Sequence, residues 1–154
     1  HETIVFLDLY ESHDHKIIMK TLFTDKLLYL LILAPIPFWV TTAGVDSGTQ
    51  SPVINQILIL AILYPMLEET VFRGIIQPTI YNRLNGRLGL FSYANILTSI
   101  LFSLAHLPSH EPIWALAVFI PSLAFGLLKD KYKTLLAPVA LHSYYNTGYF
   151  LIAG

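Results

Sequence analysis

The sequence predicts an all-α protein, a polytopic membrane helix bundle with about five transmembrane helices. Of its 154 residues, 55% are hydrophobic and only 12% are charged, which is about half the charged share of ordinary soluble domains. The few charges also leave long stretches of chain untouched. Five charge-free runs result, at 27–45, 47–67, 88–110, 112–128 and 134–154.

Each run is about as long as a helix needs to be to cross a ~30 Å hydrocarbon core. A soluble all-helical domain is the alternative, but a chain of this size cannot bury five helices that are apolar on all sides. The first run contains Pro35 and Pro37, so its helix is expected to be kinked. The sequence therefore favours an integral membrane protein.

The basic residues suggest an orientation. They gather before the first run, around the end of the second, and between the fourth and fifth: Lys16, Lys20, Lys26, Arg73, Arg83, Arg87, Lys129, Lys131 and Lys133. Because Lys and Arg concentrate in cytoplasmic loops, the N-terminus is expected to be cytoplasmic. Trp39 and Trp114 would then lie near the outer interface. The first 26 residues mix apolar and acidic side chains and suggest an interfacial helix, in which His13 and His15 belong to a surface tract rather than a metal site.

Glu68, Glu69 and Arg73 interrupt this apolar background. A charge at the membrane centre costs about 2.5–3.5 kcal/mol unless it is paired or faces a polar cavity. Glu69 and Arg73 stand four residues apart with the acid first, which favours an ion pair on one helical face. Glu68 is turned by about 100° from Glu69. We therefore expect a structural Glu69–Arg73 pair and a Glu68 that is free for chemistry.

Two later runs carry polar groups at the same spacing. Phe102 and His106 share one helical face, as do His142 and Asn146. Either histidine alone has an ordinary explanation in hydrogen bonding between helices. A carboxylate and two histidines on three separate runs, each with a partner four residues away, indicate a functional site.

These residues resemble the three motifs of one family. Glu68–Arg73 matches EExxxR, Phe102–His106 matches FxxxH and His142–Asn146 matches HxxxN. They are the signatures of the CAAX-protease and bacteriocin-processing (CPBP) family of intramembrane proteases, also called Abi. The likeness covers about 57–148. It implies a catalytic core of four transmembrane helices in 51–154. Residues 1–50 carry no such resemblance, and there the apolar pattern alone predicts an interfacial segment and a first transmembrane helix.

The resemblance implies an intramembrane endopeptidase of a bacterial or archaeal cell membrane. Its substrate would be a membrane-associated peptide or protein, such as a prenylated CAAX tail, cut near its end, and its other partner would be membrane lipid. By analogy, Glu68 and His106 activate a water molecule. His142 and Asn146 serve the oxyanion, while Glu69, Arg73 and Phe102 support the site. The net charge of −1 gives no indication of a nucleic-acid partner.

Other chemistries remain open on the sequence. Glu68, His106 and His142 could give zinc three ligands and leave a fourth position for water; a metal-free mechanism without cofactor is the favoured prediction. A non-catalytic bacteriocin self-immunity protein is the alternative function, and a proton or ion pathway is a further one.

The depth of the three groups raises a geometric question. Straight helices would leave His106 well above Glu68 and His142. A tilted third helix, a re-entrant segment at 74–90 or a different helix boundary would close the gap.

Overall fold

The computed structural model describes residues 24–43 and 54–152. The predicted interfacial segment, with His13 and His15, therefore lies outside the described residues apart from its last three. The chain forms two compact units, 1–34 and 35–154. In the first, helix α2 (Lys26–Leu33) is capped by Asp25, whose Oδ1 accepts a hydrogen bond from the Leu27 amide at 3.0 Å.

The first apolar run, whose helix was expected to be kinked at its prolines, is divided into two helices. Helix α2 ends at Leu33, and α3 (Ile36–Thr42) begins with Pro35 as its N-cap. Proline lacks the amide hydrogen that would continue the helix. The boundary between the two units falls at the same place.

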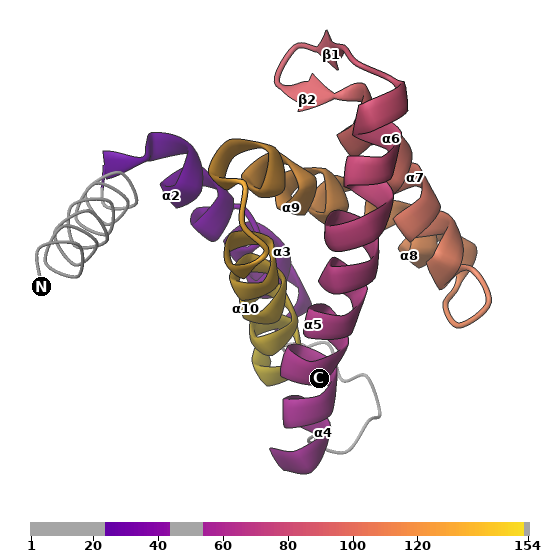
Figure 1. The fold of residues 1–154 in the computed structure, drawn as a ribbon. Helices are drawn as coiled ribbons and strands as arrows, with labels where there is room; N and C mark the ends of the chain where they lie inside the picture. Colours follow the sequence, from indigo (N-terminus) through magenta and orange to yellow (C-terminus); the bar gives the residue numbers. More distant parts are fainter. Residues whose placement is uncertain (1–23, 44–53, 153–154) are drawn as a thin grey trace, which may run out of the picture. The chain divides into compact units, whose positions relative to one another are not determined.

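A long helical run forms one side of the second unit (Figure 1). It consists of α4 (Ile54–Leu58), η1 (Ile59–Leu63), α5 (Tyr64–Glu69), η2 (Thr70–Ile76) and α6 (Gln77–Arg83). The segments η1 and η2 are π-helical, and each is followed at once by a turn that contains a proline, Pro65 or Pro78. Because proline cannot bond to the preceding turn, a wider π turn accommodates it.

The second charge-free run ends at Leu67, but the helix continues through the charged residues to Arg83. Because Glu69 and Arg73 pair with each other inside the protein, the helix can continue past them without exposing unpaired charges to an apolar environment. Within the stretch 74–90, for which a re-entrant segment was one of the alternatives, residues 74–83 are helical and continue the same helical run.

The chain then reverses through a short hairpin of β1 (Arg87–Leu88) and β2 (Phe91–Ser92), which pair antiparallel. Gly89, with φ +58°, provides the left-handed residue of the turn. Helix α7 (Tyr93–His106) follows, and the Ser92 hydroxyl caps it by accepting from the Asn95 amide at 3.0 Å. It packs against α6 and η2, so it runs back along the helix before it.

Three helices complete the unit: α8 (Pro112–Ala117), α9 (Phe119–Tyr132) and α10 (Leu136–Ile152). Helix α9 packs against both α7 and α10. Within the described part of the chain, Pro112–Tyr132 is the one helical stretch that is long and apolar enough to cross a membrane, with a mean hydropathy of 1.7. The all-α prediction is confirmed, and a bundle of five transmembrane helices stays a prediction.

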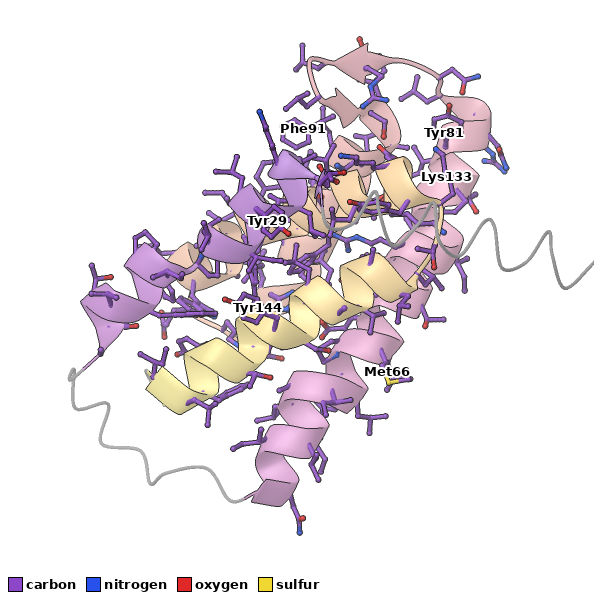
Figure 2. The ribbon with its side chains drawn as sticks, turned by 90° about the vertical axis from the view of Figure 1, so that its left-hand side faces the viewer. Tyr29, Met66, Tyr81, Phe91, Lys133 and Tyr144 are labelled. Atoms are coloured by element: carbon purple, nitrogen blue, oxygen red, sulfur yellow. The ribbon has the colours of Figure 1, made fainter. Side chains whose placement is uncertain are left out.

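Polar side chains are buried while many large apolar ones are exposed. Apolar side chains project from the helices, as Met66 does in Figure 2. Ile113, Ile120 and Leu136 are 84%, 73% and 75% exposed. The buried polar and charged groups of the second unit are Glu69, Arg73, Gln77, Ser92, Asn95, Thr98, Ser99, Ser103, Ser122 and His142. Such a distribution suits a chain whose surroundings are apolar.

Candidate active site

The two adjacent glutamates occupy the last turn of α5 and differ in exposure. Glu69 is fully buried and pairs with Arg73, which is also fully buried, at 3.2 Å between Oε2 and Nε. Glu68 remains 31% exposed in its side chain. The expected separation is therefore present: one carboxylate is enclosed and paired, and its neighbour can be reached from outside.

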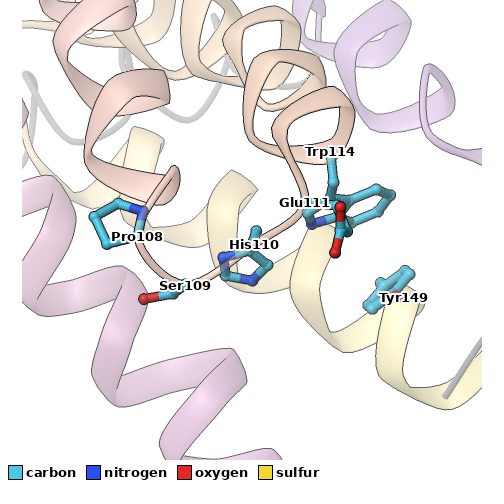
Figure 3. Close-up of a pocket in the computed structure, with 6 residues that line it drawn as sticks. All are labelled: Pro108, Ser109, His110, Glu111, Trp114 and Tyr149. Carbon is cyan, nitrogen blue, oxygen red and sulfur yellow. The ribbon is translucent and has the colours of Figure 1, made fainter.

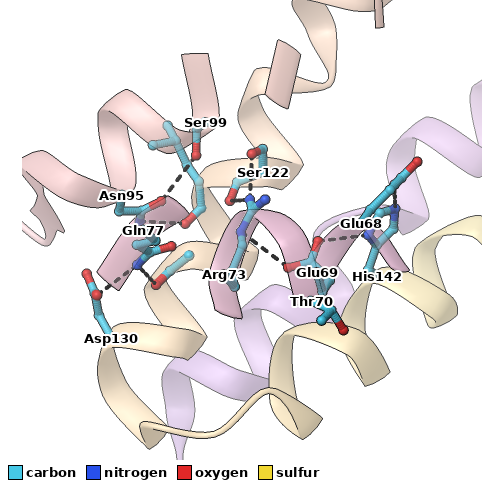
Figure 4. A network of polar contacts seen from close by, with 12 residues as sticks. Glu68, Glu69, Thr70, Arg73, Gln77, Asn95, Ser99, Ser122, Asp130 and His142 are labelled. Carbon is cyan, nitrogen blue, oxygen red and sulfur yellow. Dashed lines mark hydrogen bonds and ion pairs between the residues drawn. The ribbon is translucent and has the colours of Figure 1, made fainter. Parts of the chain in front are cut away.

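Arg73 is held from several sides (Figure 4). Its Nη2 donates to the Ser122 backbone carbonyl at 2.7 Å and contacts the Ser122 hydroxyl at 2.6 Å. The guanidinium also lies over the rings of Phe102 and Phe125, at 5.0 and 5.8 Å from their centroids. Ion pair, hydrogen bonds and ring faces together compensate for part of the hydration that the buried cation loses, while its Nη1 has no hydrogen-bond partner in the described part of the chain.

His142, on α10, contacts both glutamates (Figure 4). Its Nδ1 lies 2.9 Å from Glu69 Oε1, and its Nε2 lies 3.7 Å from Glu68 Oε2. An ionised carboxylate can only accept, so Nδ1 carries a proton and donates it to Glu69. The imidazole also stacks on Phe125, with centroids 4.5 Å apart and planes 15° apart. Glu69 thus joins Arg73 to His142, a second contact that the sequence analysis did not anticipate.

His106 ends α7 and lies beside Phe102. Its Nδ1 is 2.8 Å from the Phe102 carbonyl oxygen, which can only accept, so the proton is on Nδ1 and Nε2 keeps its lone pair in the neutral ring. The ring centroids of His106 and Phe102 are 4.6 Å apart, and Phe102 lies 5.8 Å from His142 in turn. Phe102 is therefore the aromatic link between the two histidines.

Straight helices would have left His106 well above Glu68 and His142, and helix length explains how it reaches their level. Helices η2 and α6 have 7 residues each, and α7 has 14. Because α7 returns along them after the hairpin, its last residue reaches the level at which η2 begins, next to Glu69. The 5.0 Å contact between the Phe72 and Phe102 rings fixes this register. The helical run continues to Arg83 before the chain turns, and this extra length removes the expected difference in depth between His106 and the other two residues.

Asn146 is one turn beyond His142 on α10, but its amide is directed elsewhere. Its Nδ2 donates to the Leu60 carbonyl oxygen at 3.0 Å. Leu60 belongs to the π-helical segment η1. This bond ties α10 to the long helix and leaves one Asn146 N–H for another acceptor.

A second polar cluster joins α6, α7 and α9, and the sequence analysis missed it. Gln77 Nε2 donates to the Gly126 carbonyl at 3.2 Å and to Asp130 Oδ1 at 2.8 Å. Asn95 Nδ2 donates to the Leu123 carbonyl at 3.0 Å. One signal was available in the sequence: Asn95, Ser99 and Ser103 recur every four residues in an apolar run and are all buried.

Zinc binding by Glu68, His106 and His142 was the alternative chemistry, and it stays a prediction. Glu68 and His142 are close, although among the described residues no group of three His, Asp or Glu side chains is gathered at one point. The Nδ1 atoms of His106 and His142 both make hydrogen bonds, so each neutral ring keeps its Nε2 lone pair.

Fold and site together define an all-α protein with a buried carboxylate–histidine centre. A profile of the type II CAAX prenyl endopeptidase Rce1-like family matches residues 50–148, and the chain belongs to this family. The chain is also 24% identical, over 123 residues, to the "Putative membrane peptidase YdiL" of Bacillus subtilis (strain 168). The match covers 75% of this chain and 47% of that protein. The chain thus spans about half the length of this relative. No solved structure shows a significant match.

Proposed function

We propose that this protein is an intramembrane endopeptidase that uses water activated by Glu68. Its substrate would be a membrane-associated peptide of the prenylated CAAX type, cut near its end. The observation that carries the proposal is the division between the two glutamates: Glu69 is enclosed between Arg73 and His142, while Glu68 stays accessible beside His142. Membership of the Rce1-like family supports the reaction class.

The membrane would surround the apolar faces of the helices. We propose that the five charge-free runs cross it, with the N-terminus in the cytoplasm of a bacterial or archaeal cell. The exposed apolar side chains and the buried polar centre support this placement. The continuous helix from Ile54 to Arg83, which includes most of the second charge-free run, is about 45 Å long at ~1.5 Å per residue. It can therefore cross the bilayer despite the three charges near its centre.

In the proposed reaction, a water molecule lies between the Glu68 carboxylate and Nε2 of His106. Glu68 accepts one of its protons as the oxygen bonds to the peptide carbonyl carbon. The proton then passes from Glu68 to the amide nitrogen, the C–N bond breaks, and a carboxylic acid and an amine leave. The closed Glu69–Arg73 pair contributes no proton. It holds the helix and the His142 ring.

The oxyanion requires donors placed before the reaction starts. We propose that His142 Nε2–H, in the protonated ring, and the remaining Asn146 N–H supply them. Glu69 supports this role of His142 because its carboxylate accepts from Nδ1 and fixes the ring plane. The Leu60 carbonyl does the same for Asn146 by occupying its other N–H. Glu69 would thus orient the His142 N–H, and the Leu60 carbonyl the Asn146 N–H, toward the oxyanion.

The test is Glu68→Gln in lipid nanodiscs, with farnesylated peptides as substrates and mass spectrometry to detect cleavage. The variant keeps the shape of the side chain and removes the base. We expect a loss of cleavage of at least about 10²-fold with an unchanged melting temperature. Cleavage at the wild-type rate would overturn the mechanism. Absence of cleavage in the wild type across prenylated and unmodified peptides would overturn the protease proposal itself.

A further inference from the structure

A separate cavity, shallow and widely open on one side, lies at the end of α7. It lies between the loop after His106, the first turn of α8 and the last part of α10, and has a volume of about 540 Å³. Figure 3 shows the side chains that line it: Pro108, Ser109, His110, Glu111, Trp114 and Tyr149. None of these residues has a role in the proposed reaction.

The cavity adjoins the candidate active site. The His110 ring lies 5.5 Å from the His106 ring, centroid to centroid. The loop between them is ordered by the backbone, because the amides of Ser109 and His110 donate to the His106 carbonyl at 3.1 and 3.0 Å. An extended peptide advances about 3.3–3.6 Å per residue. A substrate residue whose side chain occupies the cavity would therefore lie within about three residues of the scissile bond, if that bond is cut beside His106.

One wall of the cavity is aromatic. The rings of Trp114 and Tyr149 have centroids 5.4 Å apart, and the Phe38 ring, which is not part of the lining, lies 5.7 and 6.3 Å from them. Aromatic faces carry partial negative charge and attract cations, Trp most strongly. Three rings in mutual contact form a rigid wall of this kind.

The cavity also contains a negatively charged side chain, Glu111. The Glu111 carboxylate lies next to the Trp114 ring (Figure 3). No side chain in residues 24–43 and 54–152 forms an ion pair with it. The lining contains no Lys or Arg that could neutralise the carboxylate or bind an anion. A carboxylate beside aromatic faces is a combination that recognises a cationic group.

We propose that this cavity binds a lysine or arginine side chain of the peptide substrate, close to the scissile bond. The inference rests on the proposed function and adds a substrate preference to it. A zwitterionic lipid headgroup also presents a cation, but its phosphate would meet Glu111, and the lining offers that phosphate only the His110 imidazole and no Lys or Arg. A basic side chain of a peptide brings the cation without that phosphate, so the lining favours the peptide.

The experiment measures binding without cleavage. Glu68→Gln protein in nanodiscs is titrated with farnesylated octapeptides in which one lysine, or its uncharged mimic norleucine, occupies each position in turn. At one or two adjacent positions we expect lysine to improve affinity about fivefold to tenfold. Adding Glu111→Gln should remove most of that gain, and Glu111→Lys should transfer the preference to a glutamate peptide. Ile113→Ala, at a side chain 84% exposed on the same helix, is the matched control and should keep the preference.

The possible results separate this inference from the protease proposal. If wild type cleaves the peptides but neither lysine nor Glu111 affects affinity, the cavity proposal is overturned and the function stands. If lysine is preferred through Glu111 but wild type cleaves nothing, the cavity stands and the function falls. If phosphatidylcholine nanodiscs abolish the lysine preference that phosphatidylglycerol nanodiscs retain, the cavity is a headgroup site and the peptide proposal is overturned.

Discussion

Replacing Arg73 by methionine would remove the charge that balances Glu69 and keep most of the side-chain volume. Both residues are 0% exposed. The substitution also removes the two contacts with Ser122 and the guanidinium between the Phe102 and Phe125 rings. Glu69 would retain only His142 as a partner. A buried carboxylate would thus lose most of its compensation.

The expected cost follows from this burial. Removing one partner of a buried ion pair typically costs about 3–5 kcal/mol, because the other charge stays behind in an apolar environment. For a chain of this size, 1 kcal/mol corresponds to about 2–4 °C in melting temperature. Arg73→Met should therefore lower the melting temperature by about 6–20 °C. Adding Glu69→Gln should recover part of the loss, since the uncompensated charge is then gone.

The assay is thermal unfolding in detergent, followed by circular dichroism, with the single and double variants compared in one cycle. Arg83→Met is the matched control, because Arg83 is exposed at the end of the same helical run. It should change the melting temperature by less than about 2 °C. An Arg73→Met protein as stable as Arg83→Met, or a double variant that loses the sum of both single losses, would refute a structural role for the pair.

Three further results are expected. Gly126→Ala should cost about 1–3 kcal/mol of unfolding free energy, because a Cβ at this position would collide with Asn95. In the same melts Gly74→Ala should cost less, because its Cβ would approach only the tip of the Leu135 side chain, at 3.3 Å. Equal costs would contradict this packing. Asn146→Ala should lower kcat about 10²-fold or more with little change in KM, as for a lost oxyanion donor, and a pure KM effect would argue against that role. Cleavage should survive exhaustive treatment with chelators, and a loss that zinc restores would show that a metal takes part.

Some features followed from the sequence because they depend on one helix at a time. The four-residue spacing of Glu69 and Arg73 places them on one face wherever the helix lies, and their ion pair forms. Pro35 breaks its helix for reasons contained in its own ring. The EExxxR, FxxxH and HxxxN spacings predict Glu68, His106 and His142 as site residues without any knowledge of contacts between helices, and their catalytic roles stay a prediction.

Contacts between helices depend on where the chain turns and on the register of one helix against the next, and these only the tertiary structure decided. The turn falls after Arg83, and α7 returns from it so that Phe102 contacts both His106 and His142. The same packing gives Glu69 its second partner, His142, and turns the Asn146 amide to the Leu60 carbonyl. Residue spacing fixes a direction around a helix axis, but the neighbour found in that direction is fixed by packing.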